Sequence, residues 1–195
     1  VFAVFTHAEN GEAQKQRSDY ADYKSYPAVC YRRAAADGHV ADGKHGDENA
    51  CKRSADAGKQ SIDDQLKWLE KALAASKAKW KLVVGHHPIF ADTSKSDTER
   101  KDMQDRVKPL LEKYGVDMYL CGHIHNFQHI KRADSQVEYL VNSSGSLARK
   151  VNQTEGTQFC SPEAGFTLFS LNDNELTFFL YNSKGKILYQ HSLKK

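Results

Sequence analysis

The sequence has no block of basic residues and no long hydrophobic run. Lysine and arginine never occur in a block longer than a pair, and 28 basic against 25 acidic side chains leave a net charge of only +3. A nucleic-acid groove or a polybasic membrane patch is therefore poorly supported, and we expect no nucleic-acid partner. No apolar run approaches the roughly 18 residues that a membrane span requires, so we expect a soluble protein.

The chain also lacks a starting Met and a signal-peptide pattern. Residues 1–5 form an apolar run, as expected of a chain that begins inside a fold. The length of 195 residues, with 39% hydrophobic and 27% charged residues, suits one folded domain or a piece of one. A single α/β unit commonly needs roughly 150 to 250 residues, so we expect one core.

Cysteine is too scarce for a disulfide-rich mini-protein, because the chain contains only four. Cys30 and Cys51 lie in one polar segment and could close a loop of about 20 residues, and we expect them to be bonded if the protein is secreted. Cys121 lies in an apolar run, which predicts a buried free thiol. Cys160 has no obvious local partner.

Two N-x-S/T acceptor sites for glycosylation occur, at Asn142 and Asn152. Together with the possible bridge between Cys30 and Cys51, they favour a secretory compartment. We therefore expect a glycoprotein that is secreted or lies in the lysosomal or secretory lumen.

The segment from about residue 7 to residue 60 is polar and has almost no apolar periodicity, which favours a long insertion loop. From Ser61 the pattern becomes helical, because Ser61 can cap a helix. Apolar side chains then follow at spacings of 4, 3 and 4, at Ile62, Leu66, Leu69 and Leu73. This helix is predicted to end near Ser76.

Residues 82–84 and 116–121 are predicted strands, separated by an amphipathic helix over about 97–114. Pro109 predicts a kink or break in that helix, and Gly115 its C-terminal end. The order of helix, strand, helix and strand is typical of a parallel α/β arrangement.

After residue 125 the pattern becomes β. Alternating apolar residues and turn signals predict strands at 137–141, 166–171, 176–181 and 187–190. We expect the last three to form an antiparallel meander.

Each of the two predicted parallel strands runs into a glycine and then histidines, at Gly85-His86-His87 and at Gly122-His123-Ile124-His125. Ligands bind beyond the carboxyl ends of parallel strands, so both groups should meet at one edge of the sheet. Imidazoles are good ligands for transition metals, and we expect His86, His123 and His125 to converge on a metal site.

The remaining histidines are less informative. For His87, direct contact with the substrate and a structural role both stay open. For His129 and His191, ordinary structural roles are favoured.

The histidine groups carry a family resemblance. Val83-Val84-Gly85-His86 matches a V-x-x-H motif and Gly122-His123-Ile124-His125 a G-H-x-H motif of the calcineurin-like metallophosphoesterases. From about residue 65 to the end, the chain most resembles the purple, or tartrate-resistant, acid phosphatases of the animal type. The resemblance implies an α/β fold, in which residues 1–195 form the C-terminal portion of a metallophosphoesterase β-sandwich flanked by helices, with a polar insertion at about 7–60.

The same resemblance implies a dinuclear metal centre that hydrolyses phosphate monoesters. By motif position, His86 and His123 would bind the divalent metal, which is Fe(II), Zn or Mn, and His125 would bind Fe(III). His87 is the candidate catalytic residue.

The chain departs from the family in two ways. Two Asp ligands, a Tyr and an Asn belong upstream of a strand like residues 1–5, and none of them is present. A missing N-terminal half or a partner chain would have to supply them, so we expect this chain alone to be inactive. Residues 91–94 also offer no His, where animal-type relatives place one near the substrate. The alternative is an inactive phosphatase-like scaffold or subunit of a larger assembly.

Overall fold

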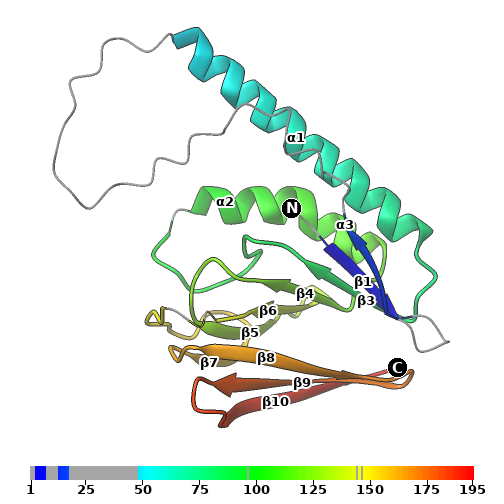
Figure 1. Cartoon of the computed structure of the whole chain (residues 1–195), viewed down its shortest axis with the longest axis vertical. Helices are drawn as coiled ribbons and strands as arrows, with labels where there is room; N and C mark the ends of the chain where they lie inside the picture. Colours follow the sequence, from blue (N-terminus) through cyan, green and yellow to red (C-terminus); the bar gives the residue numbers. More distant parts are fainter. Residues whose placement is uncertain (1–2, 8–12, 18–47, 96, 144, 146) are drawn as a thin grey trace, which may run out of the picture.

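The computed structural model describes residues 3–7, 13–17 and 48–195, except residues 96, 144 and 146. Three layers are visible in Figure 1: helices, a seven-stranded sheet, and a three-stranded sheet on the far side. The two sheets form a sandwich whose first sheet is covered by helices on its other face. This confirms the expected mixed α/β sandwich flanked by helices.

The larger sheet has the strand order β2-β1-β3-β4-β6-β5-β7. Its centre is parallel, since β3 (Trp80–Val84) pairs with β4 (Met118–Cys121) and β4 pairs with β6 (Glu138–Val141). The other members are β1 (Ala3–His7), β2 (Ala13–Arg17), β5 (Phe127–Lys131) and β7 (Thr157–Ser161). The parallel pairing of β3 with β4 confirms the arrangement that the sequence predicted.

The smaller sheet is the antiparallel meander expected from the turn residues. It consists of β8 (Gly165–Leu171), β9 (Glu175–Asn182) and β10 (Ile187–Lys194). Asn172 Oδ1 accepts hydrogen bonds from the backbone N–H groups of Asn174 and Glu175, both at 2.9 Å, and so shapes the first turn.

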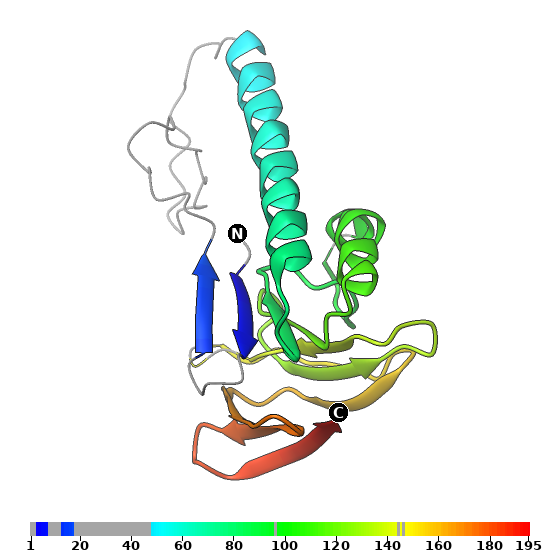
Figure 2. The same ribbon diagram turned by 90° about the vertical axis from the view of Figure 1, so that its right-hand side faces the viewer.

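The first long helix, α1 (Glu48–Ala75), begins earlier than predicted. Ser61 lies within the helix and is not its N-terminal cap. The added turns contain three Ala, two Lys, one Arg and one Gln, which favour helix without an apolar stripe, so periodicity alone placed the start too late. Figure 2 shows α1 rising away from the sheets, with β1 and β2 on one side and the later helices on the other.

The second predicted helix consists of three parts: α2 (Asp97–Asp102), a π-helical turn η1 (Met103–Val107) and α3 (Lys108–Lys113). Pro109 lies in the first turn of α3, where its missing N–H needs no partner. The irregularity therefore precedes Pro109 as a π-helical turn. Gly115, with φ 60°, follows the helix end as predicted, since glycine adopts this left-handed conformation without steric strain.

Two cores result from the alternation of side chains along the strands. Val83 and Tyr119 face the helices and pack with Leu69, Leu73 and Leu111. The opposite face packs against the small sheet through Trp80, Met118, Phe127, Leu140, Leu176, Phe178 and Leu180. Residues one position apart on a strand thus belong to different cores.

Other predictions had different outcomes. Strands β2, β5 and β7 were not predicted, and β2 lies in the segment 7–60 that was expected to be a loop. The described part of the apolar run, residues 3–5, belongs to β1, which runs antiparallel to β3. Cys121 is buried and free, as predicted. The bridge between Cys30 and Cys51 stays a prediction, because Cys30 lies outside the described residues. None of the helices in the described ranges is long and apolar enough to cross a membrane.

Candidate metal centre at the strand ends

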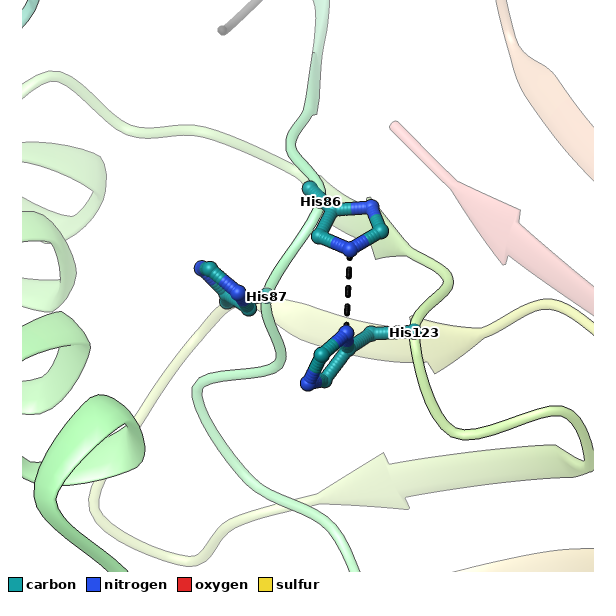
Figure 3. Close-up of side chains that lie close together, drawn as sticks. All are labelled: His86, His87 and His123. Atoms are coloured by element: carbon teal, nitrogen blue, oxygen red, sulfur yellow. Dashed lines mark hydrogen bonds between the residues drawn. The ribbon is translucent and has the colours of Figure 1, made fainter. Parts of the chain in front are cut away.

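His86 and His123 emerge at the same edge of the parallel sheet. The pairing of β3 with β4 continues past both strands, because Gly85 N–H donates to Leu120 O at 2.9 Å and Gly122 N–H donates to His86 O at 3.2 Å. His86 Nε2 lies 2.9 Å from His123 Nδ1, as Figure 3 shows. The two strand ends therefore bring two ring nitrogens into direct contact.

A third imidazole joins them. The ring centroid of His87 lies 4.6 Å from that of His123 and 4.9 Å from that of His86. Potential ligand atoms of these three residues all lie within 4.8 Å of one another. Tyr119 O–H donates to His87 O at 2.8 Å and fixes the backbone here. We refer to His86, His87 and His123 as the strand-end cluster.

Two histidines of the G-H-x-H motif have left-handed backbone. His123 has φ 71° and His125 has φ 65°. Such conformations are unusual for residues with a Cβ and cost about 1–3 kcal/mol each when the surrounding structure holds them. The strain thus falls on both histidines of the G-H-x-H motif.

His125 is placed differently from the other predicted ligands. It is not one of the three histidines whose nitrogens come together. Its Nδ1 is buried and has no hydrogen-bond partner among the described residues. A buried nitrogen without a partner is unfavourable and is suited to accept a ligand. The assignment of His125 to a metal therefore stays a prediction.

Two charged residues at the site, Lys95 and Glu99, belong to no sequence motif that predicted them. Lys95 Nζ lies 2.9 Å from His123 Nε2, and Glu99 Oε2 lies 3.3 Å from the same nitrogen. Glu99 Oε2 is also 3.8 Å from His87 Nε2. Only their position on the segment that leaves the end of β3 could have indicated them.

The segment carrying Lys95 is anchored to β5. Gln128 is buried, its Oε1 accepts the Asp92 N–H at 2.7 Å, and its Nε2 donates to Asp92 O at 2.9 Å. Asn152 N–H donates to Asp92 Oδ2 at 2.7 Å. These bonds fix the segment whose end places an ammonium group beside His123.

The histidines at this edge favour the neutral form. Burial, and then the positive charge of Lys95, lowers the pKa of His123 to about 4. Burial, and then His87 and Lys95, lowers the pKa of His86. Neutral imidazole is the form that binds a metal, so these rings are ready to act as ligands.

The donor set fits a divalent ion. Imidazole nitrogens suit zinc and iron, and Glu99 adds a carboxylate beside His123. A trivalent ion beside a divalent one requires more negative charge than one carboxylate brings. The described residues therefore fit part of a dinuclear centre.

The two glycosylation candidates differ in exposure. Asn152 is exposed, and its side chain lies 3.4 Å from Asp92 Oδ2. Asn142 is half-buried, and its Oδ1 accepts a hydrogen bond from Thr167 at 2.7 Å.

Histidines at the ends of adjacent parallel strands in a helix-covered sandwich define an α/β protein with a candidate metal site at the strand ends. Residues 10–127 match the calcineurin-like phosphoesterase family. The chain belongs to this family, and membership implies a dinuclear metal centre.

The curated relatives include acid phosphatases. Mouse tartrate-resistant acid phosphatase type 5 is 34% identical over 141 residues, covering 67% of this chain and 42% of the relative. Purple acid phosphatase 17 of Arabidopsis thaliana is 35% identical over 133 residues, covering 64% of this chain and 38% of the relative. The chain thus spans about two fifths of the length of these relatives.

Two solved structures share the fold. GAP50, described as the anchor in the inner membrane complex of Plasmodium, matches with a TM-score of 0.57 and 25% identity over 73% of this chain and 44% of its own. Purple acid phosphatase from yellow lupin seeds matches with a TM-score of 0.51 and 17% identity, over 67% of this chain and 28% of its own. The second likeness concerns the fold alone.

Proposed function

We propose that this chain contributes histidine ligands and a phosphate-binding lysine to an acid phosphatase that hydrolyses phosphate monoesters. The contact of His86 with His123 at the strand-end edge is the observation that carries the proposal. Family membership and the acid phosphatase relatives support it. The remaining carboxylate ligands come from a segment or partner chain outside these 195 residues.

His86 and His123 would hold the divalent ion, Fe(II), Zn or Mn, and His125 would hold Fe(III) through its ring. When bound, such a pair of ions polarises the phosphate and lowers the pKa of a bound water. The unpartnered Nδ1 of His125 supports its role as a ligand. The neutral state of His86 and His123 leaves their lone pairs available for the ion.

The positive charge of Lys95 recruits the substrate. Its ammonium group lies beside His123 and can pair with a phosphate dianion, because lysine binds phosphate as a point charge. It occupies the part of the site where residues 91–94 offer no histidine. Glu99 lies beside His123 and His87, and His87 can contact the substrate from the third side.

A secretory or lysosomal location fits this activity. An acidic lumen suits a phosphatase in which burial and Lys95 lower the pKa of the ligand His123 to about 4. Exposed Asn152 is the better candidate for glycosylation, and half-buried Asn142 the weaker one.

The test compares residues 1–195 alone with the same chain completed by the proposed N-terminal segment or partner chain, both supplied with iron and zinc. We expect the completed, longer protein to carry two metals and to hydrolyse an aryl phosphate at acidic pH. The short chain should show little or no turnover. Robust turnover by the short chain would contradict the need for outside ligands.

A second candidate function is a non-catalytic scaffold. It is favoured by the likeness to GAP50, described as an anchor, over 73% of this chain. This candidate predicts that the longer protein folds and assembles but shows no turnover with any supplied metal. Turnover that disappears in His123→Ala would exclude it.

A further inference from the structure

A second group of metal-binding side chains lies between the two sheets, away from the strand ends. It consists of His129 on β5, Glu138 on β6 and His191 on β10, whose potential ligand atoms all lie within 4.8 Å of one another. His129 is 0% exposed and Glu138 is 4% exposed. We refer to these three residues as the inter-sheet cluster.

The donors of the inter-sheet cluster are arranged around one point. His129 Nε2 lies 2.8 Å from Glu138 Oε2, and the rings of His129 and His191 are 4.8 Å apart between centroids. Zinc binds imidazole nitrogen at about 2.0–2.1 Å and carboxylate oxygen at about 2.0–2.2 Å in a tetrahedral arrangement, so its ligand atoms lie about 3.3–3.5 Å from one another. The potential ligand atoms of the cluster lie within 4.8 Å of one another, so a bound ion would draw the half-buried His191 ring toward His129 and Glu138.

The outer contacts of His129 also fit a metal ligand. Its other ring nitrogen, Nδ1, lies 3.0 Å from the hydroxyl oxygen of Tyr189. A metal-bound histidine usually donates its second N–H to an oxygen, which fixes the ring and its tautomer. In the metal-free state Nε2–H donates to Glu138. On binding, the proton sits on Nδ1 and donates to Tyr189, so no proton needs to leave the histidine.

The buried carboxylate of the inter-sheet cluster has a positive partner even when no metal ion is bound. Lys131 Nζ lies 3.0 Å from Glu138 Oε1 and neutralises the buried carboxylate. The Lys131 side chain is 35% exposed, so its ammonium group can move into solvent when a cation takes its place. Lysine and a metal ion would compete for the same negative charge.

We propose that His129, Glu138 and His191 form a second binding site for a divalent transition metal such as zinc. Two imidazoles and one carboxylate are a known zinc ligand set. The ion would join three strands of two sheets, because the ligands come from β5, β6 and β10. The site is independent of the proposed phosphatase function.

The test uses the chain with His86→Ala and His123→Ala, so that the strand-end cluster no longer binds. Co²⁺ is titrated and its visible absorption followed, and Zn²⁺ affinity is measured by calorimetry. We expect this background chain to bind Co²⁺ and Zn²⁺. Adding His191→Gln should weaken both by at least about tenfold, since loss even of outer contacts costs about 10- to 100-fold. Adding Gln190→Ala, an exposed neighbour on β10, should change neither.

Two further measurements separate binding from folding. Zn²⁺ should raise the thermal unfolding midpoint of the background chain by more than that of its His191→Gln variant, because a ligand of the native state stabilises it according to its affinity. Lys131→Met should tighten Zn²⁺ binding, since the competing ammonium group is gone. Absence of binding in the background chain, or equal affinity with and without His191→Gln, would overturn the proposal.

Discussion

The strand-end cluster and the inter-sheet cluster contain similar side chains in different surroundings. His86 is exposed and His123 half-buried, and they contact each other at the edge of the sheet. His129 is fully buried, and both of its nitrogens have oxygen partners. The first cluster is open to a substrate, whereas the second is closed by protein. Burial and hydrogen-bond partners, more than residue type, therefore decide which histidines can serve a reaction.

The largest expected effect concerns the strand-end cluster. In the proposed phosphatase, His123→Ala should lower kcat for aryl phosphate hydrolysis by more than about 100-fold, because losing a ligand exceeds the 10- to 100-fold cost of losing its supporting contacts. Steady-state kinetics at acidic pH measure the effect, with Gln190→Ala as the control. A loss of less than tenfold in kcat would contradict the assignment of His123 as a metal ligand.

The next effect concerns stability and the inter-sheet cluster. Glu138→Ala should lower the free energy of unfolding by about 3–5 kcal/mol, because it leaves Lys131 and His129 without their buried partner. Glu155→Ala removes a 76% exposed partner of Arg132 and should cost less than about 1 kcal/mol. Urea denaturation compares the two variants. Equal losses of unfolding free energy would contradict the conclusion that the buried carboxylate of Glu138 stabilises the fold more than the exposed carboxylate of Glu155.

A smaller effect concerns Lys95. In the complete phosphatase, Lys95→Ala should raise KM for a phosphate monoester by about tenfold, because one charge-assisted contact of about 1.5–3 kcal/mol is lost. Lys101→Ala is the matched control, since Lys101 is exposed on α2 and pairs with Asp105. A fall in kcat with unchanged KM would show that Lys95 does not bind the ground-state phosphate.

The smallest effect is a pH dependence of the inter-sheet cluster. Burial, and then the neighbouring His129, lowers the pKa of His191 from its ordinary value of 6.5. As pH falls below 6.5, the unfolded chain takes up this proton first, so the native state loses stability. Burial raises the pKa of Glu138, but hydrogen bonds from His129 and Lys131 outweigh it, so its pKa lies below 4.5.

The contribution of Glu138 is therefore lost only below pH 4.5, as pH falls through its lowered folded pKa. The lowered pKa values of His86 and His123 add to the slope in the same range, so the unfolding free energies between pH 6.5 and 4.5 are measured in the chain with His86→Ala and His123→Ala. In that chain the slope reports His191, whose positive charge would also face Lys131. His191→Gln should flatten the stability profile in that window. An unchanged slope would mean that another group titrates there.

The two clusters also differ in how far the sequence reveals them. His86 and His123 each follow a glycine at the end of an apolar strand, and parallel pairing brings such ends together. Lys95 and Glu99 have no comparable signal, because their position depends on the course of the segment after β3. The inter-sheet cluster joins residues up to 62 positions apart, from His129 to His191, and only the stacking of two sheets shows that they meet.

The same reasoning applies to the fold. Strands β3 and β4 and the meander have apolar patterns that sequence reasoning detects. Strand β5 was missed because Gln128 and His129 are polar although they are buried. The π-helical turn before Pro109 depends on how Met103 and Val107 pack into the core between the large sheet and the helices. The spacing of apolar residues in the sequence does not show this packing.

The most direct test of the strand-end cluster is anomalous X-ray diffraction from crystals of the chain soaked in zinc. We predict a peak in contact with His86 and His123 at the carboxyl ends of β3 and β4. That peak should disappear in His123→Ala. A well-ordered structure with zinc bound elsewhere and none at these two histidines would contradict the account.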